Sequence, residues 1–345
     1  MTESFYPAVD GTTTTVKAVT DRLIDTGHDV HLIAPGPGLS TYRNARITRI
    51  SPLAKPGAQV RDALADIDPD LVHVTSPGRV GRKALKHARR MDMRTLVVQQ
   101  SPVAESTAEL WRARVAERAD RVLVTARWMR DRLADLEVDA TLWEPGVDAA
   151  AFTPALRDPW LHGRWSRAKS GHGARVVVGY AGSLHRRHGV RRLAELNAVP
   201  GIRPVVMGNG PQRDWLADRL PGAKLTGELA TGDLTIALAS LDVLVHPGTE
   251  ETCCHVLREA SASGVPVVAP RAGGAPDAVR HLETGLLYDP AETDGLARAV
   301  ASIAADPQRS MLGQRGRELA LQRSWRAAVD ELVAQHYLAS DRRAA

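Results

Sequence analysis

The chain has 345 residues, of which 43% are hydrophobic, 25% charged and 4% aromatic. This composition is typical of a globular protein with room for two domains. No apolar run approaches the roughly 18 residues of a membrane-spanning helix, and the first residues lack the pattern of a signal peptide. The two cysteines, Cys253 and Cys254, are adjacent, which excludes a disulfide framework and a four-ligand zinc site and favours a reducing, cytoplasmic setting.

The net charge of +5 comes largely from arginines that are interleaved with Asp and Glu. Basic clusters such as Arg186-Arg187 are short, and aromatic residues are too scarce for a base-stacking surface, so nucleic acid is not an expected partner. The simplest interpretation is a solvated, mildly basic surface. The alternative is attraction for anions, either the phosphates of a nucleotide sugar or the headgroups of an anionic membrane on its inner face.

Short apolar runs alternate with amphipathic stretches of helical length through the first part of the chain. The pattern predicts helices over 13–26, 79–90, 105–119 and 126–136, and strands over 30–34, 71–74, 95–98 and 121–125. Alternating strands and helices are typical of parallel sheets built from βαβ units.

The alternation breaks at residues 143–148, and a polar stretch over 157–173 has no clear period. A second series then predicts strands over 176–180, 204–207, 241–246 and 265–269, with helices over 190–197, 212–220, 231–240, 254–263, 293–304 and 307–321. We therefore expect an α/β protein with two Rossmann-like, doubly wound domains over 1–147 and 148–325. A C-terminal helix over 326–345 is expected to cross back to the first domain.

Two glutamates, Glu251 and Glu259, flank a predicted helix that follows a strand. Glu251 is expected at the carboxyl edge of the sheet, where ligands of α/β proteins bind. The backbone amides of Cys253, Cys254 and His255 would then lie at a helix N-terminus, which suits a diphosphate. Glu259 lies two turns further on and could accept hydrogen bonds from ribose hydroxyls. The alternative is an amphipathic helix with ordinary surface acids.

The complete segment resembles the signature of glycosyltransferase family 4, the retaining enzymes of the GT-B fold. The matching positions in this segment are Glu251, Thr252, Val256, Glu259, Ala260, Ala262, Gly264, Pro266, Val267, Val268 and Ala269. Further matches are Gly273, Gly274, Asp277 and the stretches 284–287, 145–148, 68–73 and 4–11. The resemblance covers nearly the whole chain and is greatest to GDP-mannose-dependent α-mannosyltransferases that act on glycolipids and phosphoinositides.

The chain departs from the family pattern where Arg and Lys normally clamp the donor diphosphate. Ser183 stands at the Arg position and His188 at the Lys position. A diphosphate without a cationic partner is poorly compensated. Arg186 and Arg187 could supply the missing charge together with protonated His188. The alternative is that these are exposed loop arginines.

Two further departures concern single positions. Cys253-Cys254 replaces the family's Phe-Gly, and these small side chains still allow the helix start to approach phosphate. Gln100 stands where many members have a histidine near the transferred sugar. A neutral amide can hold a sugar hydroxyl but cannot carry a proton at pH 7. For His73, at a strand end, we expect a structural role.

The resemblance implies two domains that face each other across a cleft, with the acceptor on the first domain and the nucleotide-sugar donor on the second. It implies retaining transfer of a hexose, mannose favoured, to a lipid, polyol or glycan hydroxyl, without metal or other cofactor. Glu251, Arg187 and Gln100 are the expected catalytic residues. The expected donor-binding residues are Gly11, Thr12, Ser183, Arg186, Arg187, His188, Gly208, Asn209, Gly210, Glu251, Thr252, Cys253, Cys254, His255, Val256 and Glu259.

Two other functions stay open from the sequence. The lost Arg and Lys favour a non-catalytic nucleotide-sugar-binding protein of the same fold. A GT-B nucleotide-sugar epimerase is the second alternative, although such an enzyme needs acid and base side chains in the cleft and the Glu251–Glu259 pattern argues against it.

The last expectation concerns the start of the chain. Family members begin with an apolar strand that leads into the segment matched here by residues 2–7, so the first strand of the N-terminal domain is missing. That strand is central in a doubly wound sheet, and its loss leaves two strand edges unpaired. We expect a start codon assigned too late; the alternative is a degraded or rearranged domain.

Overall fold

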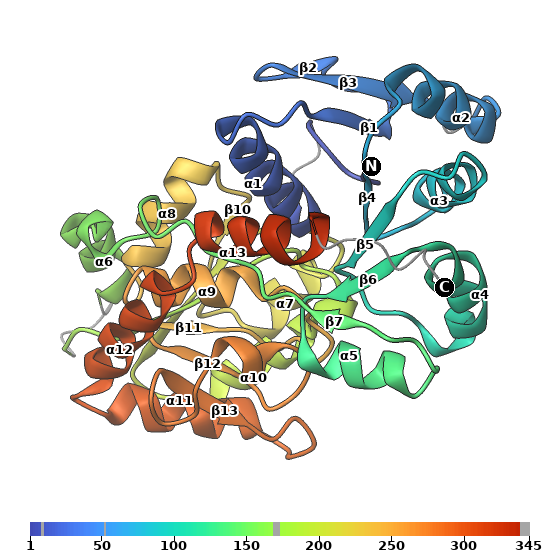
Figure 1. Ribbon diagram of the computed structural model, residues 1–345. Coiled ribbons are helices and arrows are strands. Elements are labelled where there is room, and N and C mark those ends of the chain that lie inside the picture. Colours follow the sequence, from blue (N-terminus) through green and yellow to red (C-terminus); the bar gives the residue numbers. More distant parts are fainter. Residues whose placement is uncertain (8–9, 52, 168–172, 339–345) are drawn as a thin grey trace. The chain divides into compact units, whose positions relative to one another are not determined.

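The computed structural model describes residues 1–345 except 8–9, 52, 168–172 and 339–345 (Figure 1). The chain divides into two compact units, each with its own sheet and core. The first unit contains residues 1–145 and the C-terminal residues from Trp325 onward, and the second contains Gly146–Ser324.

The second unit is built on one parallel sheet of six strands in the order β10-β9-β8-β11-β12-β13. The strands are β8 (Val176–Ala181), β9 (Ile202–Met207), β10 (Lys224–Gly227), β11 (Val243–Val245), β12 (Val267–Pro270) and β13 (Gly285–Tyr288). In every strand of this sheet except β10, neighbouring residues belong to different cores, as Val177 and Val178 of β8 do, so both faces of these strands are buried. The strand order reverses between β8 and β11, which places a ligand crevice at their carboxyl ends.

Helices and 3-10 segments connect these strands. They are η3 (Pro154–Leu156), α6 (Pro159–Ser166), η4 (Arg186–His188), η5 (Val190–Ala198), α7 (Arg213–Arg219), α8 (Thr231–Ala239), α9 (His255–Ala262), α10 (Ala275–Ala278), α11 (Gly295–Ala305) and α12 (Arg309–Leu321).

The first unit contains two sheets instead of one. The larger has the order β4-β5-β6-β7, with β4 (Val72–Thr75), β5 (Thr95–Gln99), β6 (Arg121–Val124) and β7 (Thr141–Leu142) all parallel. The smaller has the order β1-β3-β2, with β1 (His31–Pro35), β2 (Thr41–Tyr42) and β3 (Ala45–Ile50). The helices are α1 (Gly11–Asp25), α2 (Pro56–Ile67), α3 (Gly81–Arg90), α4 (Ala108–Arg114), α5 (Arg127–Ala134) and α13 (Trp325–Leu332), with short turns η1 (Glu105–Thr107), η2 (Ala116–Arg118) and η6 (Val333–Tyr337).

The C-terminal segment completes the first unit. Trp143 is fully buried and donates its indole N–H to the carbonyl of Ala328 in α13 at 2.8 Å. Arg22 of α1 pairs with Asp330 of α13 at 2.6 Å. The helix predicted over 326–345 corresponds to α13 and η6, and residues 339–345 lie outside the described part of the chain.

A cavity of about 1050 Å³ separates the two sheets of the first unit. Both β1 and β4 line it, and Met1 and Thr2 connect the two: the amide of Thr2 donates to the carbonyl of Ile33, and the amide of Thr75 donates to that of Met1. The sequence predicted a gap in the sheet of the first domain. In the structure this gap lies between the edge strands β1 and β4, which belong to separate sheets.

Several predicted elements need correction. The stretch over 157–173, for which no element was predicted, contains α6, and its residues 168–172 lie outside the described part of the chain. The helix predicted over 105–119 is a short helix between two 3-10 turns. The helix predicted over 190–197 is the 3-10 segment η5. Strands β2, β3, β7, β10 and β13 and helices α2 and α10 had no counterpart among the predicted elements.

Candidate active site

Loops from the carboxyl ends of β8, β9 and β11 meet closely in the second unit. The amide of Leu184 donates to the carbonyl of Asn209 at 2.9 Å. A Cβ on Gly208 would lie 1.9 Å from the carbonyl oxygen of Gly182, and one on Gly189 would lie 2.5 Å from that of Pro247. Glycine at 208 and 189, both with positive φ, therefore allows the three loops to pack backbone against backbone.

Glu251 lies beside these loops and is held by two histidines. Its Oε1 is 2.7 Å from Nδ1 of His188 and 3.2 Å from Nε2 of His246. Burial by itself would raise the pKa of Glu251, but the hydrogen bond with His188 and the close polar contact with His246 outweigh burial and hold that pKa well below its usual range. Glu251 is therefore a carboxylate at neutral pH, at the place where the sequence predicts it.

Arg187 is connected to Glu251 through His188. The Nε–H of Arg187 donates to Nε2 of His188 at 3.1 Å, and Nδ1 of the same imidazole approaches Glu251. The imidazole of His188 therefore lies between a guanidinium group at Nε2 and a carboxylate at Nδ1. The structure thus brings Arg187 and His188 together beside Glu251, and a protonated His188 stays a prediction.

His246 is the site residue that sequence reasoning missed. It directly follows β11 and is 5% exposed, and its ring stacks on Tyr180 with 6.0 Å between centroids and 4° between planes. The available signal was a histidine at the carboxyl end of a central strand, five residues before Glu251. An apolar run that ends in His does not distinguish a core histidine from a site residue.

At the start of α9, Cys254 stands where the family pattern has glycine, and its backbone has a conformation typical of glycine. Cys254 is the N-cap of α9 and has a φ of 50°, in the left-handed region that favours glycine. Cys253 and Cys254 are both buried, and burial raises the pKa of the Cys254 thiol, so that it is neutral. Thr252, His255 and Val256 lie in the same turn, so the predicted helix N-terminus is at the expected place.

Glu259 lies on the second turn of α9. Burial raises its pKa to about 7, so the carboxyl group changes its charge near neutral pH. Such a shift is common at functional sites, although structural carboxyls have it too.

The remaining predicted donor residues fall into two groups. Ser183, Arg186, Gly208, Asn209 and Gly210 lie on the loops that follow β8 and β9, together with Arg187 and His188. Gly11, Thr12 and Gln100 belong to the other unit. There, the side chain of Asp10 caps α1 by accepting from the amide of Thr13 at 2.8 Å.

Gln100 and His73 are both largely enclosed by the first unit. Gln100 is 8% exposed, and its backbone N–H donates to the hydroxyl of Ser76. His73 Nδ1 lies 2.6 Å from the hydroxyl of Tyr337, and burial lowers the pKa of His73 to about 3. His73 is therefore neutral and part of the interior, as expected of a structural histidine.

The described residues contain no group of three or more His, Cys, Asp or Glu side chains arranged to hold a metal ion. Around the loops after β8 and β11, the structure brings together the carboxylate of Glu251, the imidazoles of His188 and His246, and the guanidinium group of Arg187. This set can hold hydroxyl groups and compensate negative charge.

Comparisons with known proteins place both units among sugar-transferring enzymes. Residues 9–151 match the family model described as Glycosyltransferase Family 4, and residues 175–306 match the one described as Glycosyl transferases group 1. The chain is 36% identical to a GDP-mannose-dependent alpha-mannosyltransferase of Mycolicibacterium smegmatis, with 97% of this chain and 95% of the relative covered. A protein of the same name from Corynebacterium glutamicum is 32% identical, with 97% and 87% covered.

Solved structures share the fold at lower identity. Anabaena HepE in complex with UDP and glucose superposes with a TM-score of 0.80 at 17% identity, covering 98% of this chain and 99% of the other. Sucrose-phosphate synthase from Thermosynechococcus elongatus gives 0.79 at 20% identity, covering 98% and 96%. At these identities the likeness concerns the fold.

Proposed function

We propose, because the chain belongs to glycosyltransferase family 4, that it transfers mannose from GDP-mannose to a hydroxyl group of a lipid, polyol or glycan, with retention of configuration. The chain is a glycosyltransferase of the GT-B fold. The observation that supports the proposal most is the carboxylate of Glu251, held at the carboxyl edge of the second sheet beside Arg187 and the start of α9.

The proposed step exchanges one bond at the anomeric carbon of mannose. The bond from that carbon to the β-phosphate oxygen breaks, a bond to the acceptor oxygen forms on the same face, and the acceptor proton passes to the leaving diphosphate. Arg186, Arg187 and the amides at the start of α9 would compensate the charge that develops on the diphosphate, so the proposal requires no metal. Glu251 would accept hydrogen bonds from mannose hydroxyls, and Glu259 from the ribose.

The test compares donors and variants in one experiment. Thermal shift is measured with GDP-, UDP-, ADP- and dTDP-sugars, and transfer is followed with labelled GDP-mannose and membrane lipid or polyol acceptors. A donor at 100 times its dissociation constant should add about 2.7 kcal/mol of stability. GDP-mannose is expected to give the largest shift, and a larger shift with another nucleotide would contradict the choice of donor.

Glu251→Ala should lower kcat by about 100-fold or more, because the lost carboxylate interacts with the sugar in the transition state. The neighbouring Glu250 is exposed and supplies the matched control: Glu250→Ala should leave kcat within twofold of the unmodified chain. Equal turnover of both variants would refute the role of Glu251.

A non-catalytic nucleotide-sugar binder remains the second candidate, favoured by Ser183 at the position of the family's arginine. It predicts a thermal shift with GDP-mannose but no transfer to any acceptor. Transfer above the level of the Glu251→Ala variant would dismiss it.

We further propose peripheral contact of the first unit with an anionic membrane, through α3. This helix buries Gly81, Ala84, Leu85 and Ala88 and directs a basic face outward. The basic residues of that face are Arg82, Lys83, Lys86, His87, Arg89 and Arg90. The proximity of Arg90 lowers the pKa of Lys86, with smaller contributions from desolvation, Lys83 and Arg118, which indicates concentrated positive charge. The described residues contain no helix long and apolar enough to cross a bilayer.

Vesicle sedimentation tests this contact. Vesicles of phosphatidylcholine with phosphatidylglycerol should bind the chain, and pure phosphatidylcholine should not. Changing Lys83, Lys86 and Arg90 to Gln should weaken binding about 100-fold, at about 1 kcal/mol per charge. Changing Arg213, Lys224 and Arg298 of the second unit removes the same charge and serves as the control. Equal losses in both triple variants would assign the binding to net charge alone.

A further inference from the structure

His246 has a buried imidazole that approaches the carboxylate of Glu251. It is 5% exposed, and within the described residues neither Nδ1 nor Nε2 makes a hydrogen bond of good geometry. A buried polar group without a partner costs about 1–3 kcal/mol. Such a group in a folded protein calls for an explanation, and one explanation is a role that is completed only when a ligand binds.

The imidazole is held rigidly and points toward Glu251. Its ring stacks in parallel on Tyr180, and the hydroxyl of Tyr180 donates to the carbonyl of Ser183 at 2.9 Å, which fixes the stacking partner. Nε2 of His246 lies 3.2 Å from Oε1 of Glu251. The distance is that of a polar contact, and a small movement of either side chain would convert it into a directed hydrogen bond.

The backbone next to His246 is adapted to this approach. A Cβ on Gly248 would lie 2.8 Å from Oε1 of Glu251 and 3.0 Å from Nε2 of His246. Any larger residue at 248 would therefore push the two side chains apart. Glycine is required at this position by the contact between two side chains, and not by a positive φ.

His188 contacts the same carboxylate oxygen from another loop and through its other ring nitrogen. His188 uses Nδ1 and lies on η4 after β8, whereas His246 uses Nε2 and lies directly after β11. Two imidazoles on two elements thus define the position of one oxygen more narrowly than either could alone.

We propose that His246 is a positioning residue, which together with His188 orients the Glu251 carboxylate toward the hydroxyl groups of the transferred sugar. The role presupposes the glycosyl transfer proposed above. It adds a residue that lies outside the Glu251–Glu259 segment and explains why a buried histidine is stacked at this strand end.

Amide side chains can test which nitrogen matters. The side-chain nitrogen of Gln matches Nε2 of histidine in position, and that of Asn matches Nδ1. His246→Gln should therefore keep kcat within about fivefold, whereas His246→Asn should lower it by about 100-fold. At position 188 the order reverses, and His188→Asn should be more active than His188→Gln. Both variants at each position have the same chemistry, so each is the control for the other.

Binding measurements separate positioning from folding. The dissociation constant of GDP, which lacks the sugar, should be unchanged in His246→Asn, while turnover of GDP-mannose falls. A lower melting temperature with weakened GDP binding would show that His246 is merely structural and would overturn the proposal. So would equal kcat values for the Gln and Asn variants at 246.

A readout without substrate distinguishes this proposal from the proposed function. Nitrogen-15 spectra of the imidazoles should show a proton on Nε2 of His246, and its signal should move in Glu251→Gln but not in Glu250→Gln. If the unmodified chain neither binds nor uses GDP-mannose, the proposed donor is wrong while the spectra still test the contact. An unmoved His246 signal in Glu251→Gln would overturn the positioning role even in an active enzyme.

Discussion

Glu259 has a carboxyl group at a place where burial disfavours its charge. Because its pKa is raised to about 7, its contribution to stability is present below the ordinary pKa of a glutamate and is lost as pH rises through 7. Without ligand, Glu259→Gln should therefore stabilise the protein at pH 8, by about 3 kcal/mol, and change it little at pH 4.5. Thermal melts at both values measure this, with Glu250→Gln as the control.

The same group predicts how donor binding depends on pH. Ribose hydroxyls donate to a carboxylate better than to a neutral carboxyl group, so the KM for the donor should fall as pH rises from 6 to 8. In Glu259→Gln the KM for the donor should be higher and should not vary between pH 6 and pH 8. A KM for the donor that is unaltered by Glu259→Gln would assign Glu259 to the helix surface alone.

Residues differ in how far the sequence could predict their surroundings. Glu251 and Glu259 have a fixed spacing around a helix, so their places at its start and second turn followed from the pattern. His246 and His188 belong to different loops, and their meeting at one oxygen depends on side-chain rotamers and on the packing of Gly189 and Gly248. Hydrophobic periodicity in the sequence cannot predict such a contact between two loops.

At the scale of elements, buried strands were predictable because both faces of the sheets are covered. The runs of β8, β9, β11 and β12 are apolar throughout and had predicted counterparts. β10 is an edge strand whose described residues are only partly buried, so its apolar signal is weak. α6 also lacks an apolar stripe, so periodicity does not reveal it. Its sequence signal lies at its N-terminus, where Asp158 is the N-cap and Pro159 is the first helical residue.

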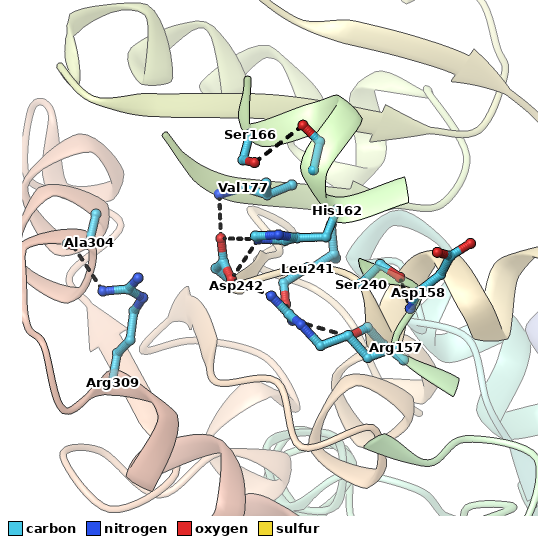
Figure 2. A network of polar contacts seen from close by, with 12 residues as sticks. Arg157, Asp158, His162, Ser166, Val177, Ser240, Leu241, Asp242, Ala304 and Arg309 are labelled. Atoms are coloured by element: carbon cyan, nitrogen blue, oxygen red, sulfur yellow. Dashed lines mark hydrogen bonds and ion pairs between the residues drawn. The ribbon is translucent and has the colours of Figure 1, made fainter. Parts of the chain in front are cut away.

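Figure 2 shows the polar network that fixes α6 to the second sheet. Asp242 accepts from the amide of Val177 at 2.8 Å, from Arg157 at 2.8 Å and from His162 at 3.0 Å. Burial would raise the pKa of Asp242, but these hydrogen bonds outweigh it and lower that pKa. Its stabilising contribution is therefore present above the ordinary pKa of an aspartate and is lost as pH falls below it.

Asp242→Asn should destabilise the second unit by about 2–4 kcal/mol at pH 7, because Arg157 loses its ionic partner and the hydrogen bonds of Val177 and His162 lose a charged acceptor. The difference from the unmodified chain should shrink as pH falls below the ordinary pKa of an aspartate, because the unfolded chain then binds the proton more readily than the folded one. Urea unfolding at pH 7 and pH 3 measures this, and Asp233→Asn on the exposed start of α8 is the control. A difference that is equal at both pH values would contradict an ionic role for Asp242.

At the scale of the whole molecule, the first unit has two strand edges that face a common cavity. Both β1 and β4 are parallel members of their sheets, and the two edges line the same space of about 1050 Å³. An extended apolar segment joined to Met1 could pair with both edges and bury apolar area. The cavity is where the sequence predicted an interruption, although the division into two separate sheets was not foreseen.

Six residues rich in Val and Ile, placed ahead of Met1, should raise the melting temperature by about 5 °C or more. A segment of the same length rich in Asp, Lys and Pro cannot pair and is the control. Equal melting temperatures of the two extended proteins would show that the cavity does not accept a strand.

The way the chain enters and leaves the second unit has a consequence for engineering. The amide of Val147 donates to the carbonyl of Arg323 at 3.0 Å, and Val147 bridges to Ser324, so the two ends of this unit lie side by side. The second unit is thus an insertion with adjacent termini. Residues 146–324 are suited to separate expression and to circular permutation through a short linker between Ser324 and Gly146, with new ends opened in an exposed loop.

The first unit can be closed in the same way. Trp143 and Trp325 lie 6.4 Å apart between ring centroids, so a linker of a few residues would suffice to join the two segments of that unit. The carboxylate of Glu251 and its two imidazoles could then be studied on a chain of about half the length.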